Sequence, residues 1–137
     1  MNKNNLHKLI SGTREKYEKI GSVWCPILKT NVHFSSEGRI HLLYKGNRKK
    51  RPVKEQFYKL KLFPSVVPVI KTATEIKSIR LSKNNKIRYY AIVGIVNKKK
   101  IRVIIKKTNN GNFNYHSVML DKTNKPQIGA HLYLFPA

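Results

Sequence analysis

The apolar positions of the chain change their spacing near residue 74, and this change divides the sequence into two halves. Before that point apolar residues recur every three or four positions, which is typical of helices with one buried face. After it, apolar and polar residues alternate, which is typical of strands. The 137 residues therefore predict a single α+β domain, with a helical half at about 1–73 and an antiparallel sheet at about 75–137.

Two elements are expected before residue 35. Residues 4–20 have the apolar spacing of a helix, and the Ser-Gly pair that ends at Gly12 can interrupt it. Residues 22–34 resemble two short strands joined by a turn at 29–31. Pro26 lacks a backbone N–H, so the predicted hairpin belongs at the edge of a sheet.

The stretch "VHFSSEGRIHLLYK" at residues 32–45 predicts another helix. Ser35 or Ser36 can cap its first turn by accepting a hydrogen bond from a free backbone N–H. One helical stripe then carries the apolar residues Ile40, Leu43 and Tyr44. His41 falls on the neighbouring stripe. A further helix is expected from about Val53, with the prolines of "FPSVVPVIKTA" interrupting or restarting it.

Four β-rich runs follow residue 75: "EIKSIRLS", "KIRYYAIVGIV", "KIRVIIKK" and "FNYHSVML". Short turns rich in Asn, Lys and Gly separate them, which predicts a four-stranded antiparallel meander. The last ten residues, "IGAHLYLFPA", could add one more short strand. The predicted architecture has the helices packed on one face of this sheet.

Alternation also assigns the strand residues to two faces. The predicted core face carries Ile87, Tyr89, Ala91, Val93, Ile95, Ile101, Val103, Ile105, Val118 and Leu120. The predicted exposed face carries Arg88, Arg102, Lys106, Tyr115 and Ser117, and Arg80 can join it. A register error of one residue would invert the contribution of a strand.

The net charge of the chain is its strongest indication of function. Twenty-nine Lys and Arg residues stand against six Asp and Glu, which gives a formal net charge of +23. Like charges repel within a compact chain, so an excess of this size indicates a polyanionic partner, most commonly nucleic acid. The alternative is a lysine-rich and asparagine-rich composition inherited from an AT-rich genome, although such a bias does not by itself remove acidic residues.

The few acids also exclude several kinds of chemistry. They are scattered singly, so no pair has the spacing that a two-metal phosphodiesterase or a glycosidase requires. Cys25 is the only cysteine, which leaves neither a disulfide framework nor a zinc knuckle. No signal peptide and no apolar run of about 20 residues is visible, so a cytoplasmic protein is expected, without metal or other cofactor.

The order of elements and the ending "YHSVM" resemble the barnase/EndoU/colicin/RelE-like (BECR) ribonuclease superfamily, in particular its members from phages and mobile elements. The resemblance covers about residues 30–120. It implies a BECR-like fold and a small metal-independent endoribonuclease. Such enzymes are often toxins that are paired with an immunity or antitoxin protein.

The resemblance also implies site residues. In that superfamily an active histidine comes from the helical half, basic residues from central strands, and a hydroxyl with a neighbouring His or Tyr from the last strand. The matching positions here are His41, Arg88, Lys106, Tyr115, His116 and Ser117. The chain departs from the barnase branch because no catalytic glutamate is recognised, which leaves the identity of the general base open.

These residue types suit RNA cleavage because RNA carries its own nucleophile, the 2′-OH. His41 or His116 could act as base or acid, and a cationic surrounding should lower the pKa of either ring. Lys106, Arg88 or Arg102 could hold the phosphate, and Ser117 could donate a hydrogen bond to a non-bridging oxygen. Tyr115 could stack on a base.

A basic run supplies further phosphate contacts. The residues expected in this patch are Arg39, Arg48, Lys49, Lys50 and Arg51. Each candidate also has an ordinary structural explanation: a solvated helix, a strand hydroxyl or a core aromatic. His7, His33 and His131 are taken as structural. The main competing function is a non-catalytic RNA-binding or DNA-binding protein that uses the same basic face.

Overall fold

The computed structural model describes residues 3–45 and 49–121. Its helices are α1 (Lys3–Ile20), α2 (Ser36–His41), α3 (Val53–Leu62), the short 3-10 helix η1 (Phe63–Ser65) and α4 (Val66–Thr72). The helix predicted at 4–20 and the start of α3 at Val53 are confirmed, and α1 runs through Gly12 without a break. Within the described ranges, no helix combines the length and the apolar character needed to span a bilayer.

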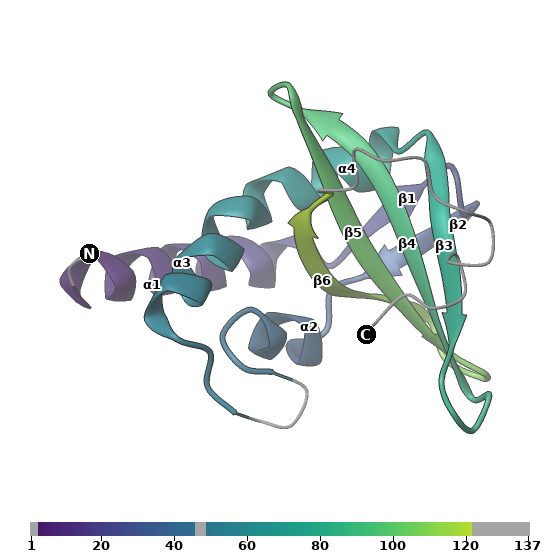
Figure 1. The fold of residues 1–137 in the computed structure, drawn as a ribbon, viewed down its shortest axis with the longest axis horizontal. Helices are drawn as coiled ribbons and strands as arrows, with labels where there is room; N and C mark the ends of the chain where they lie inside the picture. The colour runs from purple at the N-terminus through teal and green to yellow at the C-terminus, as the bar shows by residue number, and fades with distance from the viewer. Residues whose placement is uncertain (1–2, 46–48, 122–137) are drawn as a thin grey trace.

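The sheet has six strands, not four (Figure 1). They are β1 (Ser22–Cys25), β2 (Thr30–His33), β3 (Glu75–Leu81), β4 (Ile87–Val96), β5 (Lys99–Thr108) and β6 (Phe113–Leu120), in the order β1-β2-β6-β5-β4-β3. The antiparallel meander β3 to β6 is confirmed.

The predicted hairpin is also confirmed, and it joins this meander to make the sheet mixed. β2 pairs in parallel with β6 through Val32 opposite Phe113 and His33 opposite Asn114, which leaves β1 at the edge. This pairing joins segments about 80 residues apart, and no local pattern announces it. The strand expected in the last ten residues lies outside the described ranges.

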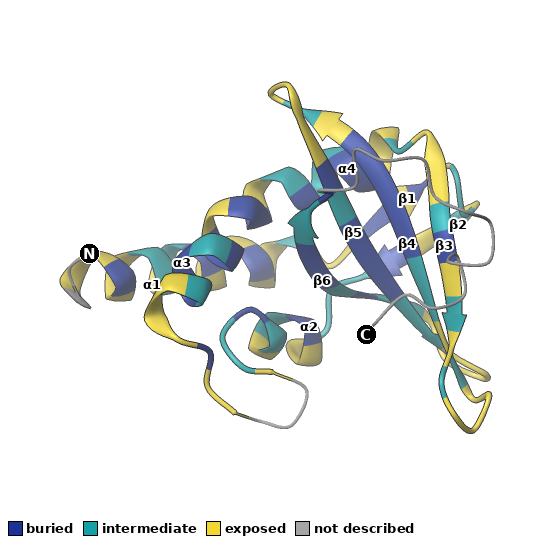
Figure 2. Cartoon of the chain, viewed as in Figure 1, coloured by how far each residue is buried: buried dark blue, intermediate teal, exposed yellow. Residues whose placement is uncertain are grey.

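Helix α4 forms the centre of the core, where it packs against β1, β4 and β5 (Figures 1 and 2). Val66, Val69 and Ile70 have no exposed surface. Gly94 of β4 faces this helix, and a Cβ there would lie 3.5 Å from atoms of Val69. The helix therefore lies against the backbone of the strand.

The predicted faces of β4 are inverted. Residues opposite each other on paired strands share a face, and Tyr90, Ile92 and Gly94 lie opposite Ile105, Val103 and Ile101. The core face of β4 therefore carries Arg88, Tyr90, Ile92 and Gly94, whereas the predicted core residue Ile95 is 70% exposed. Alternation could not decide this strand because Ala91, Ile92 and Val93 are all buried, so both faces read as apolar.

The face of β6 changes at an irregularity. Ile104 lies opposite Ser117, but Ile105 lies opposite Tyr115, so His116 is an extra residue in the ladder. Such a bulge re-aims the side chains next to it. Tyr115 consequently turns into the core, where 1% of it is exposed, although the sequence pattern places it on the exposed face.

Helix α3 covers the free edge of β6 beyond the short pairing with β2. The Leu120 backbone N–H donates to the Tyr58 hydroxyl at 2.8 Å, and the Lys59 ammonium donates to the Val118 carbonyl at 2.6 Å. These side chains satisfy backbone groups that a seventh strand would otherwise bind. The helix is thereby held at a defined position along the strand.

Helix α2 is seated on β6 by close packing at Gly38. A Cβ at Gly38 would lie 2.5 Å from the Tyr115 carbonyl oxygen and 2.6 Å from the Tyr17 hydroxyl. That hydroxyl donates to the Ser35 carbonyl at 2.5 Å. Ser35 occupies the predicted cap position of α2, but its side chain makes no capping hydrogen bond. Tyr17 and the close approach at Gly38 therefore position this short helix.

We expect Gly38→Ala to destabilise the fold by about 1–3 kcal/mol, because the new methyl group overlaps backbone and forces α2 away from β6. Urea unfolding measures the change. Gly12→Ala is the matched control: a Cβ at Gly12 meets nothing within 4 Å, so this variant should be as stable as the wild type or more stable by up to about 1 kcal/mol. Equal stability of the Gly38 variant and the wild type would contradict this account of how α2 is seated.

Candidate functional site

An open cleft of about 680 Å³ lies between α2 and β6. Its lining residues are Ser36, Glu37, Ile40, His41, Tyr44, Lys45 and His116. His41 is the last residue of α2, and His116 is the extra residue of the β6 bulge. The two candidate histidines, 75 positions apart in the chain, therefore meet in one cavity.

The imidazoles of His41 and His116 are in direct contact. Their ring centroids lie 4.3 Å apart with an angle of 66° between the planes, an edge-to-face arrangement. The ring of His116 also contacts Tyr89 of β4 at 5.2 Å, and the Arg80 guanidinium lies 4.5 Å from the Tyr89 ring. The ring of Tyr89 therefore contacts His116 from the sheet, and His41 contacts it from helix α2.

Arg51 holds the other side of His41. Its Nε donates to the His41 carbonyl at 3.1 Å, one terminal nitrogen lies 3.1 Å from His41 Nδ1, and the other pairs with Glu55 at 2.6 Å. Only 8% of Arg51 is exposed. Arg51 was predicted as a phosphate contact, but in the structure it is a buried clamp on a histidine.

Two neighbours compete for Nδ1 of His41. The guanidinium of Arg51 only donates, so this contact requires an unprotonated Nδ1. The Tyr44 carbonyl, 3.3 Å away, only accepts and requires a protonated Nδ1. The neutral ring satisfies one partner at a time. In one tautomer Nε2 carries the proton, and in the other Nε2 has a free lone pair that can take a proton.

Both histidines are held in the neutral form. Burial, followed by the charge of Arg51, lowers the pKa of His41 to about 4. Burial, followed by the influence of His41 and Lys106, lowers the pKa of His116 to about 3. The lowering expected from a cationic surrounding is confirmed in direction, although burial is its largest cause. At neutral pH the site therefore holds two uncharged imidazoles surrounded by cations.

Lys59 is a member of this site that the sequence analysis missed. Its ammonium donates to Ser117 Oγ at 3.2 Å as well as to the Val118 carbonyl, and only 7% of the residue is exposed. Burial and the charge of Arg51 lower its pKa to about 8. The sequence signal was a polar pair at helical spacing, Gln56 and Lys59, on the inner side of α3.

Glu37 is the second residue that the sequence analysis missed, because the acids were treated as scattered. It lines the cleft, and its carboxylate pairs with the Lys106 ammonium at 2.7 Å. The ion pair joins α2 to β5. Lys106 thus lies near the histidines as predicted, and its charge contributes to the lowered pKa of both rings.

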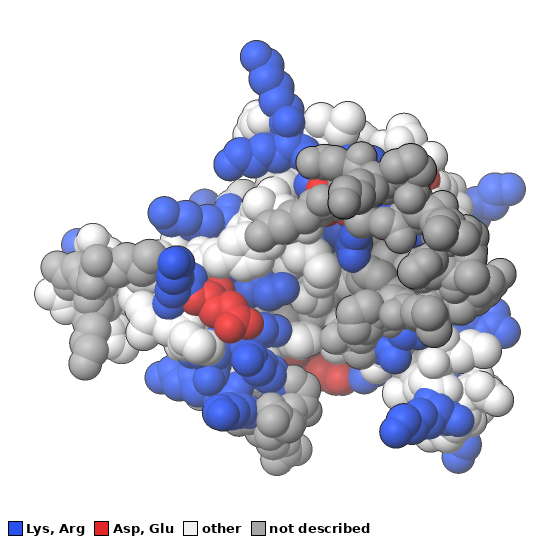
Figure 3. All heavy atoms as spheres, in the orientation of Figure 1, with Lys and Arg blue, Asp and Glu red and all other residues white. Residues whose placement is uncertain are grey.

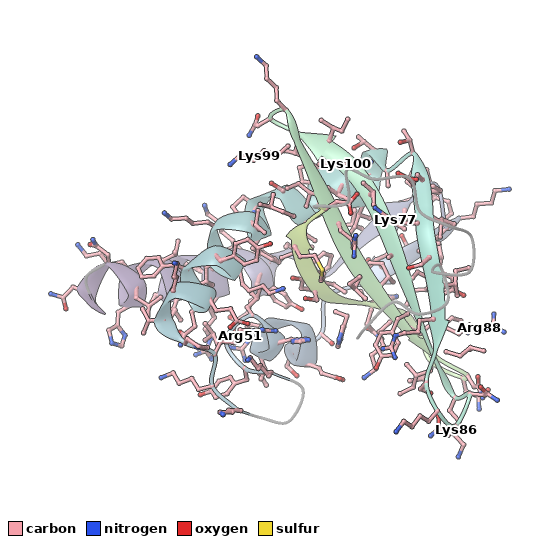
Figure 4. All side chains as sticks on the ribbon, viewed as in Figure 1. Arg51, Lys77, Lys86, Arg88, Lys99 and Lys100 are labelled. Atoms are coloured by element: carbon pink, nitrogen blue, oxygen red, sulfur yellow. The ribbon has the colours of Figure 1, made fainter. Side chains whose placement is uncertain are left out.

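Three other predicted site residues do not line the cleft. Arg88 is exposed and lies on the opposite face of β4 from Tyr89, far from Arg51 in Figure 4. Tyr115 is buried in the aromatic core, so it offers no surface to a base. Ser117 is buried, and its hydroxyl accepts a hydrogen bond from the Lys59 ammonium. The expected roles of these residues in contacting RNA do not fit their positions.

The remaining basic candidates are spread over two regions. Arg102 contacts the buried carboxylate of Asp121, together with Lys77, four residues along β5 from Lys106. Lys49 and Lys50 are exposed close to the cleft, since Lys50 forms a β-bridge with Tyr44. Arg39 is half-buried in α2. Arg48 lies outside the described residues.

On the face that Figure 3 shows, several groups of basic side chains lie over the helical half, and acidic side chains are fewer. Among residues 3–45 and 49–121, no three His, Cys, Asp or Glu side chains converge as a metal site would require.

Comparison of the chain with protein-family models, with characterised proteins and with solved structures finds no match.

We expect Lys59→Met to raise the pKa of both His41 and His116, because the ammonium lowers both values and methionine keeps the length of the side chain without its charge. Proton NMR titration of the two imidazoles measures the shift. Lys61→Met on the exposed side of the same helix is the control and should change neither titration. Unchanged values in the Lys59 variant would contradict the electrostatic coupling.

The histidine pair should also make the fold sensitive to acid. The unfolded chain binds protons on these rings near pH 6.5, whereas the folded chain does so only near pH 4 and 3. Stability is therefore lost as the pH falls from about 6.5 to about 4 through His41 and to about 3 through His116, with a slope of at most about 1.4 kcal/mol per pH unit for each histidine. Urea unfolding at several pH values should give a shallower slope for the double variant His41→Gln, His116→Gln. An equal slope would show that the two rings do not titrate as described.

Proposed function

We propose that the protein is a metal-independent endoribonuclease that cleaves RNA through attack of the 2′-OH on the adjacent phosphate. The observation that carries the proposal is the contact between two neutral imidazoles in an open cleft bordered by cations. A phosphodiester is an anion, so Lys45 on the cleft wall and Lys106 beside it favour its binding there.

The reaction requires two proton transfers, and the site offers two imidazoles. One imidazole takes the proton of the 2′-OH while O2′ forms a bond to phosphorus. The bond from phosphorus to O5′ breaks, and the second imidazole, in its protonated form, gives a proton to O5′. The products are a 2′,3′-cyclic phosphate and a 5′-OH end. A bound phosphodiester raises the pKa of a neighbouring imidazole, which supplies the protonated form that the acid needs.

Cations act on the charge that develops at phosphorus. Lys106 is a strand cation that is joined to the cleft wall through its ion pair with Glu37. Release of Lys106 from Glu37 to the phosphate would place its ammonium on a non-bridging oxygen. Arg51 and Lys59 lie deeper. Arg51 contacts His41, and the charge of Lys59 lowers the pKa of both imidazoles.

The resemblance to the BECR superfamily agrees with this proposal at His41, His116 and Lys106. A toxin-type role, an immunity or antitoxin partner and a cytoplasmic location are proposed on that resemblance alone. The net charge of +23 also favours RNA binding without cleavage, so the experiment has to separate binding from chemistry.

We expect His41→Ala to lower the rate of RNA cleavage in EDTA by about 10²–10⁴-fold, the usual contribution of one proton-transfer group. Affinity should stay nearly unchanged when it is measured with an RNA whose 2′-OH at the cleavage site is replaced by hydrogen. His7→Ala, on the exposed surface of α1, is the control and should cleave like the wild type.

The ends of the products provide a second readout. A 2′,3′-cyclic phosphate, or the 3′-phosphate formed from it, is expected. Wild-type protein that binds RNA with strong salt dependence but leaves it intact would replace the ribonuclease proposal with the binding function. Cleavage that requires a divalent cation, or that survives in the His41 variant, would also overturn the proposal.

A further inference from the structure

A second cavity of about 560 Å³ lies on the helical side of the molecule, and none of its lining residues belongs to the cleft. We propose that this groove between α1 and the segment from α3 to α4 is a docking site for an acidic amphipathic helix of another protein. The proposal concerns a surface separate from the histidine pair and does not depend on the ribonuclease proposal.

Two rows of side chains form the groove, and the row on α1 alternates apolar and polar residues. On α1, Leu9, Thr13 and Ile20 share one face, with Lys16 at the same spacing between them. On the other side Leu60, Phe63 and Val67 recur at three and four residues and continue through η1 into α4. From residue 9 to residue 20 the row on α1 is roughly 16 Å long, about three helical turns. Paired rows of this length form the seat that a third helix takes in a helical bundle.

Gly12 is the residue that the fold of the chain alone does not explain. It lies in the interior of the 18-residue helix α1, where glycine is less favourable than alanine by roughly 0.5–1 kcal/mol. A Cβ at this position would meet nothing within 4 Å, so close packing inside the chain does not require glycine. Gly12 lines the groove. A missing side chain here keeps the floor open for the side chains of an incoming helix.

The charges around the groove favour a negatively charged partner. Lys8, Lys16 and Lys61 line it, and no acidic residue does. An amphipathic helix with acidic flanks would place its apolar face on the partly exposed Leu9, Ile20 and Val67, and its carboxylates near these ammonium groups. RNA fits less well, because the floor is mostly aliphatic and its one aromatic ring, Phe63, is buried. A second copy would bring its own three lysines and a charge of +23.

The groove is also unsuited to insertion into a bilayer. Membrane-surface helices present a protruding apolar face that enters the headgroup region. Here the apolar residues Leu60 and Phe63 lie at the bottom of a recess, with exposed Lys16 and Lys61 beside them. A recess of this kind accepts protruding side chains from a partner helix.

The test uses the full chain and a fluorescently labelled peptide of about four helical turns, with leucines at the spacing of one helical face and glutamates elsewhere. Fluorescence anisotropy at physiological salt should show binding to the wild type and to Gly12→Ala. Gly12→Trp fills the groove and should weaken binding by about tenfold or more. The double variant Lys16→Glu, Lys61→Glu should weaken it comparably without touching the core. Backbone NMR shifts on titration should map to Leu9, Ile20 and Val67.

Several results would overturn the proposal. A peptide of the same composition but scrambled spacing that binds equally well would show attraction by charge alone. Full binding to both the tryptophan and the charge-reversal variants would place the peptide elsewhere. If the wild type self-associates and Gly12→Trp abolishes this self-association, the groove binds a second copy of the chain. If the wild type binds anionic vesicles and Gly12→Trp abolishes this binding, the groove binds a lipid surface. RNA cleavage by Gly12→Trp should equal that of the wild type, which separates this test from that of the ribonuclease.

Discussion

The site depends on one extra residue in β6. Because Ile104 and Ile105 lie opposite Ser117 and Tyr115, His116 is left out of the regular ladder. The same irregularity turns Tyr115 into the core, and α2 then approaches its backbone so closely that only glycine fits at position 38. Without the bulge, Tyr115 and Ser117 would share one face, and the seat of the helix that carries His41 would be lost.

The contact between two histidines is stable only because their surroundings keep them neutral. Two imidazolium ions 4.3 Å apart would repel each other, and Arg51, Lys59 and Lys106 add further positive charge. Burial and these cations both disfavour protonation. The cations in turn have partners: Arg51 pairs with Glu55, Lys106 with Glu37, and Lys59 with a hydroxyl and a carbonyl. Two of the six acids of the chain are therefore used to hold cations in place around the pair.

Helix α3 links the edge of the sheet to the site. The same ammonium of Lys59 satisfies the Val118 carbonyl on the free edge of β6 and approaches Ser117, while the Arg51 carbonyl accepts from Gln56 of this helix at 2.7 Å. Edge protection and site geometry thus use the same contacts. A change in the position of α3 would disturb the strand edge and the clamp on His41 together.

The sequence alone determined the local elements and the meander, because apolar spacing is a property of neighbouring residues. It also identified His41, His116 and Lys106 as residues of chemical interest. It did not determine the parallel pairing of β2 with β6, the faces of β4, or the inward turn of Tyr115. These features depend on contacts between distant segments, on a strand buried on both faces and on a bulge, none of which leaves a periodic signal. Lys59 and Glu37 joined the site for the same reason, since only the packing of α2 and α3 on the sheet decides which single polar residues face the two histidines.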